Sequence, residues 1–174
     1  MSRIFGKLIQ TAYVVHDIEA ALKHWTENLG IGPWFYRELV PIEAFTYRGE
    51  PSDLKMSIAL GYSGDMQYEL IQQRNDAPSV YKAFMETIGV GQQHVGFQVD
   101  DLEASIGTGR SLGYQMEQEG TITNSGSFAY MSKGDHPGTM IEFLPMLEVR
   151  RKSWATIQSW SVNWDGSDPV RTSI

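Results

Sequence analysis

Two stretches of the chain repeat one another, and this repeat restricts the possible folds more than any other feature of the sequence. Residues 9–22 read IQTAYVVHDIEAAL, and residues 92–106 read QQHVGFQVDDLEASI. A repeat at a fixed offset predicts that one structural unit occurs twice. Placing His94 on Gln10 gives an offset of 84 residues (94 minus 10), which also places Val99 on Val15, Asp101 on Asp17, Glu103 on Glu19 and Ala104 on Ala20.

The first unit, residues 1–75, has the pattern of a strand, a helix and three further strands. Residues 8–15 are short, apolar and rich in β-branched and aromatic side chains, as strands are. Asp17 is placed to cap a helix whose apolar residues recur at the spacing of one helical face, and Gly30 is placed to end it. The three further strands are predicted at residues 33–39, 54–60 and 66–73.

The second unit, residues 92–146, repeats this order of elements. A bridge of residues 76–91, with a predicted helix at 78–88, connects the two units. The sequence therefore predicts an α+β protein built from two tandem βαβββ modules. The elements predicted for the second unit are strands at 93–99, 114–118, 127–132 and 139–144 and a helix at 101–112.

The tail, residues 147–174, has no counterpart in the first unit. A short helix is predicted at residues 150–160, and the tail contains Trp154, Trp160 and Trp164. Tryptophan side chains are rarely left in water, so we expect these three to dock on the domain or on a second subunit. The tail is then either a packing extension or a lid over the substrate.

The composition excludes several classes of function. The chain has 174 residues and a net charge of −7 without long runs of like charge, which argues against nucleic-acid and membrane partners. It has no apolar run of the roughly 18 residues that a membrane span needs, and its start lacks the apolar core of a secretory signal, so we expect a cytoplasmic protein. Because it has no cysteine, any metal must be held by nitrogen and oxygen ligands.

Polar residues occur at matched places in the two predicted units. Gln10 lies in the first strand of one unit, and His94 lies at the equivalent place in the other. Glu69 and Glu142 lie in the last strand of each unit, among apolar neighbours, at an offset of 73 residues (142 minus 69). A buried amide, imidazole or carboxylate is costly unless it is hydrogen-bonded or binds a metal.

These four residues together predict a metal site. Alone, His94 is explained by a hydrogen-bonded place in the core, and each glutamate by the solvent-facing side of its strand. Four polar residues at matched places favour a shared site instead, because a pseudo-twofold axis between the units brings them to one point. Two carboxylates, an imidazole and an amide oxygen suit an octahedral divalent cation with open water positions. Cobalt, zinc, nickel, manganese and magnesium are not distinguished by this set.

At these residues the chain resembles the vicinal oxygen chelate superfamily, which includes glyoxalase I, methylmalonyl-CoA epimerase, extradiol dioxygenases and bleomycin-resistance proteins. The resemblance extends over residues 8–145 and implies an open eight-stranded barrel-like sheet around the metal. Residues 77–106, APSVYKAFMETIGVGQQHVGFQVDDLEASI, most resemble the epimerases. Those enzymes usually have histidine in place of Gln10, whereas glutamine there resembles some glyoxalase I enzymes. The ligands implied by the resemblance are Gln10, Glu69, His94 and Glu142.

The resemblance implies proton transfer next to a carbonyl or thioester, with a divalent metal as cofactor. Glu142 is the predicted acid/base on one face of the substrate carbon. Glu50 is predicted on the opposite face, because residues 50–61 resemble the place of the epimerases' second catalytic glutamate. Glu50 is explained equally well as an exposed loop carboxylate, with Glu43 as a substitute for the catalytic role.

The resemblance also implies a small-molecule substrate, such as an acyl-CoA or another thioester, and a homodimer. An epimerase is the first expectation for the function. The alternatives are a glyoxalase I-like lactoylglutathione lyase and a non-enzymatic member that binds a small molecule. An extradiol dioxygenase is disfavoured, because its iron needs two histidines and one carboxylate and Gln10 breaks that pattern.

Overall fold

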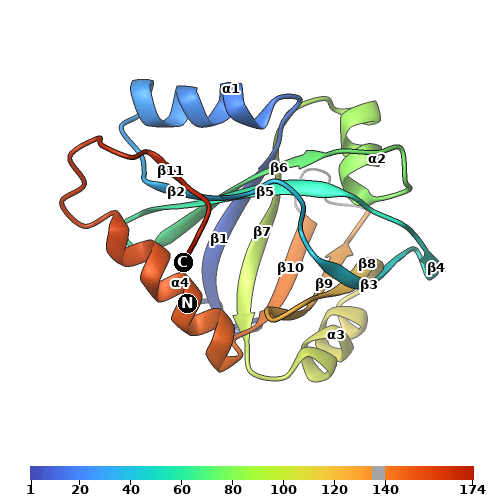
Figure 1. The fold of residues 1–174 in the computed structure, drawn as a ribbon. Helices are drawn as coiled ribbons and strands as arrows, with labels where there is room; N and C mark the ends of the chain where they lie inside the picture. The colour runs from blue at the N-terminus through green and yellow to red at the C-terminus, as the bar shows by residue number, and fades with distance from the viewer. Residues whose placement is uncertain (135–139) are drawn as a thin grey trace.

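Eleven strands form one mixed sheet that curls around the interior of the protein, as a computed structural model of the chain shows (Figure 1). The structure describes residues 1–134 and 140–174. The sheet order is β11-β2-β5-β6-β1-β7-β10-β9-β8-β3-β4, and the sheet is not closed. The strands are β1 Lys7–Val14, β2 Trp34–Arg37, β3 Ile42–Tyr47, β4 Glu50–Pro51, β5 Met56–Ser63, β6 Met66–Gln73, β7 Gly91–Val99, β8 Gln115–Ile122, β9 Gly126–Ser132, β10 Met140–Pro145 and β11 Val170–Arg171.

The pairing register at the middle of the sheet reproduces the sequence repeat. β1 runs antiparallel to β7, and Gln10 pairs with Gly96 while Ala12 pairs with His94. Each of these pairs becomes the other when 84 is added to one residue and subtracted from its partner. β6 runs parallel to β1 as β10 runs parallel to β7, which gives a pseudo-twofold axis between β1 and β7. The α+β class and the paired βαβββ order are therefore confirmed.

The number of strands differs from the predicted eight, because β3, β4 and β11 add to the two sets of four. β3 pairs antiparallel with β8, so the segment after β2 crosses from the first half of the sheet to the edge of the second half. Its sequence, IEAFTY, has an incomplete alternation of apolar and polar residues, and its partner lies far away in the sequence. β11 is only two residues long and pairs with β2. Residue 139, where the last strand was predicted to begin, lies outside the described residues.

Two helices cover the outer face of the curled sheet (Figure 1). Helix α1, Ile18–Lys23, continues as the π-helical turn η1, His24–Asn28, and packs with Trp34, Ala59 and Leu70. Helix α3, Leu102–Ser111, packs on β9 and β10. The predicted caps are present, because Asp17 accepts the N–H of Glu19 and Ala20, and Asp101 accepts the N–H of Ala104.

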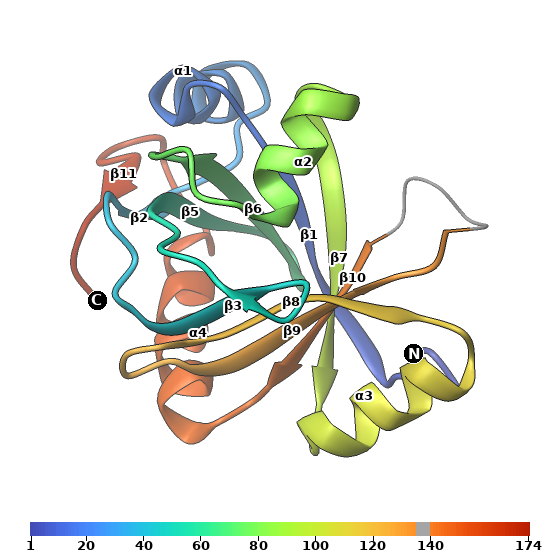
Figure 2. The same cartoon turned by 90° about the vertical axis from the view of Figure 1, so that its right-hand side faces the viewer.

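The other two helices lie against the inner side of the sheet (Figure 2). Helix α2, Val80–Thr87, buries Val80 and Tyr81 in the same cluster as the inner residues of β1, β5 and β6. Helix α4, Glu148–Trp160, is the predicted tail helix, and it places Trp154 against that cluster. The interior of the sheet is therefore filled from one side by α2 and from another by α4.

The tail tryptophans pack on the first half of the chain. Trp160 packs with Phe35, Leu60 and Tyr62. The ring of Trp164 lies over Gly32, where a β-carbon would come within 2.8 Å of it. For these two residues the packing interpretation holds. Among the described residues, no helix is long and apolar enough to cross a membrane.

Candidate metal centre

Two neighbouring rows of cross-strand pairs carry all four predicted ligands. One row runs Leu60, Glu69, Ala12 and His94 across β5, β6, β1 and β7. The next row runs Gln67, Gln10, Gly96 and Glu142 across β6, β1, β7 and β10. Residues paired directly across strands point to the same face of a sheet. The register thus places the four side chains on the inner face, around the pseudo-twofold axis.

Three of the four predicted ligands converge within the buried interior. Glu69, His94 and Glu142 each offer one ligand atom, and these atoms lie within 4.8 Å of one another. His94 Nε2 is 3.3 Å from Glu142 Oε2 and 3.6 Å from Glu69 Oε2. The exposed fractions are only 1% for His94, 5% for Glu142 and 9% for Glu69. Two carboxylates buried this close together require a compensating cation or a proton.

Gln10 lies beside this group with its amide oxygen free. Its Nε2 donates to Gln67 Oε1 at 2.7 Å, and Gln67 Nε2 donates to the hydroxyl of Tyr62 at 2.7 Å. These two hydrogen bonds orient the amide so that Gln10 Oε1 is buried without a hydrogen-bond partner among the described residues. Glu142 Oε2 is unpartnered in the same sense. Buried acceptors of this kind are rare unless a ligand or ion satisfies them, so the four residues fit a divalent cation.

A β-bulge orients the imidazole of His94. The pairing of β1 with β7 shifts by one residue between Ala12 and Tyr13, which leaves Gln93 as the extra residue of β7. The amide oxygen of Gln93 lies 2.7 Å from His94 Nδ1. Because an amide oxygen only accepts, Nδ1 carries the proton and Nε2 presents its lone pair to the two glutamates. The repeat-equivalent bulge, in β1, contains Ile9.

Two tyrosines close the side of the centre that faces α2. The hydroxyl of Tyr130 lies 3.4 Å from His94 Nε2, and the hydroxyl of Tyr81 donates to Tyr130 at 3.0 Å. Burial, and to a lesser degree the nearby glutamates, raise the pKa of both phenols well above the ordinary value. They therefore stay neutral and able to donate hydrogen bonds at every physiological pH.

Without a cation, the charges around the centre balance only if one of the two glutamates is protonated. Burial raises the pKa of Glu69 well above its ordinary value, the charge of Glu142 raises it further, and the charge of Arg150 lowers it. Arg150 comes from α4, is buried, and donates to the carbonyls of Pro145, Gly126 and Ser127. The charge of one guanidinium thus acts on two carboxylates, and a divalent cation is a further charge that this set can accommodate.

The structure does not bring Glu50 into this group. Glu50 is exposed in β4 at the edge of the sheet, and β3, β8 and β9 lie between it and the strand of Glu142. Glu43 is exposed in β3. Sequence reasoning also overlooked Gln67, Gln93, Tyr130 and Arg150. Of these, only Gln67 had a signal in the sequence, because it lies two residues before Glu69 and so shares its face of the strand.

Gly96 holds open the space that Gln10 uses. A β-carbon at residue 96 would lie 2.7 Å from Gln10 Oε1 and 3.1 Å from Leu144 Cδ1. We expect Gly96→Ala to lower the free energy of unfolding by about 1–3 kcal/mol, as overpacking does, and to weaken metal binding by displacing Gln10. The matched control is Gly107→Ala in the exposed part of α3, where nothing lies within 4 Å of the added carbon. Chemical denaturation measures the stability of each variant, and metal titration measures its metal binding. Equal effects of the two substitutions would contradict the prediction.

The chain is similar to known proteins in sequence profile and in fold. The family model described as the glyoxalase/bleomycin resistance protein/dioxygenase superfamily matches residues 9–130. No curated protein is a detectable sequence relative. Among solved structures, the methylmalonyl-CoA epimerase of Mycobacterium tuberculosis superposes with a TM-score of 0.59 at 19% identity, over 84% of this chain and 93% of that one.

Two further structures show the same fold. A protein of Bacillus halodurans superposes with a TM-score of 0.56 at 21% identity, over 81% of this chain and 94% of that one. A single-residue variant of the Streptomyces coelicolor methylmalonyl-CoA epimerase, in complex with 2-nitronate-propionyl-CoA, superposes with a TM-score of 0.52 at 14% identity, over 81% of this chain and 97% of that one. At these identities the likeness is one of fold.

Proposed function

The chain belongs to the glyoxalase/bleomycin resistance/dioxygenase superfamily, and from this premise we propose that it is a divalent-metal-dependent enzyme that moves a proton next to a carbonyl or thioester. The observation that carries the proposal is the convergence of Glu69, His94 and Glu142 beside two unpartnered buried oxygens. An epimerase that acts on an acyl thioester is the first candidate. The fold shared with methylmalonyl-CoA epimerases supports it.

The four proposed ligands have separate tasks. Gln10, Glu69, His94 and Glu142 would hold the ion, which supplies Lewis acidity toward the substrate oxygen. Gln93 and Gln67 hold the imidazole and the amide in the orientation that binding needs. Glu142 is the proposed base that takes the proton from the substrate carbon, because it is a ligand able to loosen and its Oε2 has no hydrogen-bond donor among the described residues.

The second acid/base stays a prediction. Inversion at carbon needs a donor on the face opposite Glu142, and Glu50 is the residue assigned to it from the sequence. With Glu50 exposed in β4, this role requires the reacting carbon to lie toward the β3–β4 edge. If the assignment holds, Glu50→Gln keeps deuterium exchange through Glu142 but loses inversion of the product. Chiral analysis of the product measures the inversion. If the Glu50→Gln protein retained both exchange and inversion, Glu50 would have no part in the mechanism.

A glyoxalase-type lyase is the second candidate, and Gln10 is the observation that favours it. The amide oxygen of Gln10 is buried and has no hydrogen-bond partner among the described residues, while the amide nitrogen donates to Gln67. Glutamine at this place is the feature in which the ligand set resembles some glyoxalase I enzymes. Both reactions begin with removal of a proton next to a carbonyl, so the same centre supports either, and the substrate decides between them.

The two candidates are separated by exchange of substrate hydrogen with solvent deuterium. Purified protein is analysed for bound metal and then incubated in D₂O with a panel of 2-substituted acyl-CoA thioesters and of glutathione hemithioacetals. We expect NMR to show exchange with one of the two substrate classes. We also expect this exchange to stop when the metal is removed by a chelator. Exchange with neither class would overturn both candidates and leave a non-enzymatic binding role. The homodimer stays a prediction that sedimentation measures on the same sample.

A further inference from the structure

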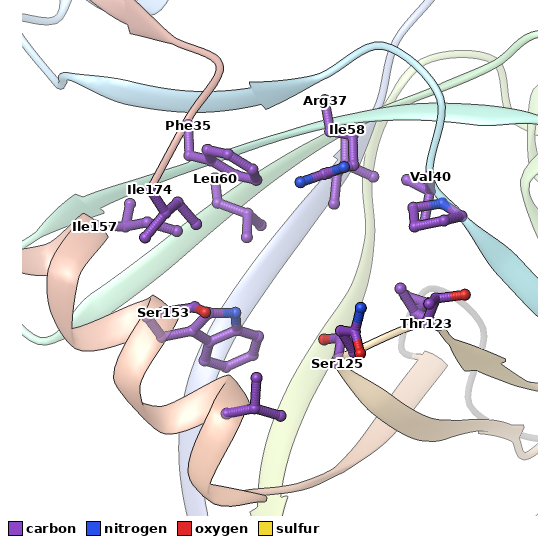
Figure 3. Close-up of a pocket in the computed structure, with 15 residues that line it drawn as sticks. Phe35, Arg37, Val40, Ile58, Leu60, Thr123, Ser125, Ser153, Ile157 and Ile174 are labelled. Carbon is purple, nitrogen blue, oxygen red and sulfur yellow. The ribbon is translucent and has the colours of Figure 1, made fainter.

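A cavity of about 360 Å³ opens between α4, the inner faces of β2 and β5, and the turn that joins β8 to β9 (Figure 3). Its walls are mostly apolar, with Phe35, Ile58 and Leu60 on the sheet side and Trp154 and Ile157 on the helix side. Pockets of roughly 300–1,000 Å³ hold small ligands, so this one suits a short acyl chain or a single ring rather than a whole nucleotide.

The cavity adjoins the metal centre through one row of the sheet. Phe35 pairs with Leu60, and Leu60 pairs with Glu69. Side chains directly opposite one another on adjacent strands have β-carbons about 5 Å apart. Leu60 in the apolar wall is thus a direct cross-strand neighbour of the proposed ligand Glu69, and a molecule whose reacting carbon lies at the centre can extend into the cavity.

Arg37 is the only charged side chain among the described residues that line the cavity. Its guanidinium carbon lies 5.4 Å from the centre of the Phe35 ring, and Figure 3 places it at the rim between Phe35 and Val40. It forms no ion pair with a described residue, and the polar side chains among the other lining residues are neutral. Ile174, the last residue of the sequence, also lines the cavity and adds a main-chain carboxylate, with which Arg37 forms no ion pair. A guanidinium stacked on a ring keeps its N–H groups free to bind a carboxylate in the plane. The cavity is therefore complementary to an apolar molecule with one anionic end.

We propose that this cavity takes the apolar chain of the substrate and that Arg37 binds a carboxylate at the far end of that chain. The inference rests on the proposed function for the place of the reacting carbon. Arg37 and Glu69 lie two strands apart, roughly 10 Å, and two residues apart along the strand direction, roughly 7 Å. The anionic group is then separated from the reacting carbon by an apolar spacer of several carbons. The substrate class is an acyl compound with a distal carboxylate.

The helix wall of the cavity is supplied by the tail, which lies beyond the two repeated units. Ser153, Trp154 and Ile157 are on α4. Trp154 therefore combines the packing and the substrate-lid interpretations of the tail, since this side chain packs on the inner cluster and also lines the cavity. The tail would then select the substrate by its shape, while strands of the sheet would supply the metal ligands and the base.

The test is calorimetric titration of the intact chain with octanoate, and with 1-octanol as a neutral probe of the same chain length. We expect saturable binding of octanoate, and about tenfold weaker binding of octanol because the hydrogen bond to a charged group is absent. Arg37→Gln lowers the octanoate affinity to that of octanol and leaves octanol binding unchanged. The control for charge is Arg110→Gln, on the exposed part of α3, which changes neither affinity.

A second pair of variants tests the shape of the cavity. Ser153→Phe fills it from α4 and abolishes binding of both probes, whereas Ser159→Phe, an exposed residue of the same helix outside the cavity, leaves both unchanged. Absence of octanoate binding, or equal affinities in the members of either pair, overturns the inference. Metal titration of the same samples separates the proposals. Failure of octanoate to bind with intact metal binding removes only the cavity inference, and octanoate binding without any proton exchange removes only the proposed function.

Discussion

Glu142→Gln is expected to lower the rate of solvent-deuterium exchange at the substrate carbon by at least about 10²-fold, the usual contribution of a positioned acid/base. Glutamine has the size of glutamate and keeps one oxygen able to coordinate, but it cannot accept the proton. Glu142 is 5% exposed in the interior of β10, and its Oε2 lies 3.3 Å from His94 Nε2. The rate is measured by NMR with the substrate class that the panel identifies.

The fold is expected to survive this substitution. It removes a buried negative charge beside Glu69, so the metal-free variant should unfold no earlier than the wild-type protein. Glu119→Gln is the matched control, because it makes the same change on an exposed strand residue of the same sheet. Metal content is measured alongside the rate, to separate loss of the base from loss of the ion. Exchange at the wild-type rate in a folded Glu142→Gln protein would end the assignment of Glu142.

The convergence of the four proposed ligands could be predicted from the sequence, because the repeat relates a position in one unit to a position in the other and so places both around one axis. His94 alone is an ordinary core histidine. With Gln10 at its repeat position, and with Glu69 and Glu142 also matched, the strand order forces all four toward one axis. The register bears this out, since Ala12 pairs with both Glu69 and His94, and Gly96 pairs with both Gln10 and Glu142.

The parts that escaped prediction depend on contacts between residues distant in the sequence. The bulge that turns Gln93 toward His94 arises from the register between two strands, which no local pattern encodes. β3 is held by β8, about 75 residues further along the chain, so its own short alternation was insufficient. Arg150 looks like any surface arginine of a helix, and only the docking of α4 buries it, where its charge interacts with those of Glu142 and Glu69.

Glu69→Gln is expected to have opposite effects on stability in the absence and in the presence of metal. In the metal-free protein, Glu69 faces Glu142, His94, Arg150 and the neutral phenols of Tyr81 and Tyr130. Burial and the charge of Glu142 raise its pKa in the folded state. The folded protein then binds this proton more tightly than the unfolded chain. The stability that this proton gives to the folded protein is complete below the pKa of Glu69 in the unfolded chain, about 4.3. It is lost as the pH rises through the pKa of Glu69 in the folded protein.

A glutamine at residue 69 is neutral at every pH and avoids this loss. The metal-free variant should therefore have a higher Tm than metal-free wild type at pH 8, and the difference should narrow as the pH falls toward the unfolded value. Added divalent metal reverses the order. It stabilises the wild-type protein by about 2.7 kcal/mol at a hundredfold excess over Kd, and it stabilises the variant much less because one anionic ligand is gone.

Calorimetric unfolding at pH 5 and pH 8, with chelator and with Mn²⁺ or Co²⁺, measures both halves of this prediction, with Glu119→Gln again as the control. The two halves test different steps. An equal rise in Tm with metal in wild type and variant means that Glu69 is not a ligand. A metal-free variant that is no more stable at pH 8 means that Arg150 already balances the buried carboxylates. The inversion of the two Tm values is expected only if Glu69 is kept in the interior for the cation, at a cost in stability to the protein without it.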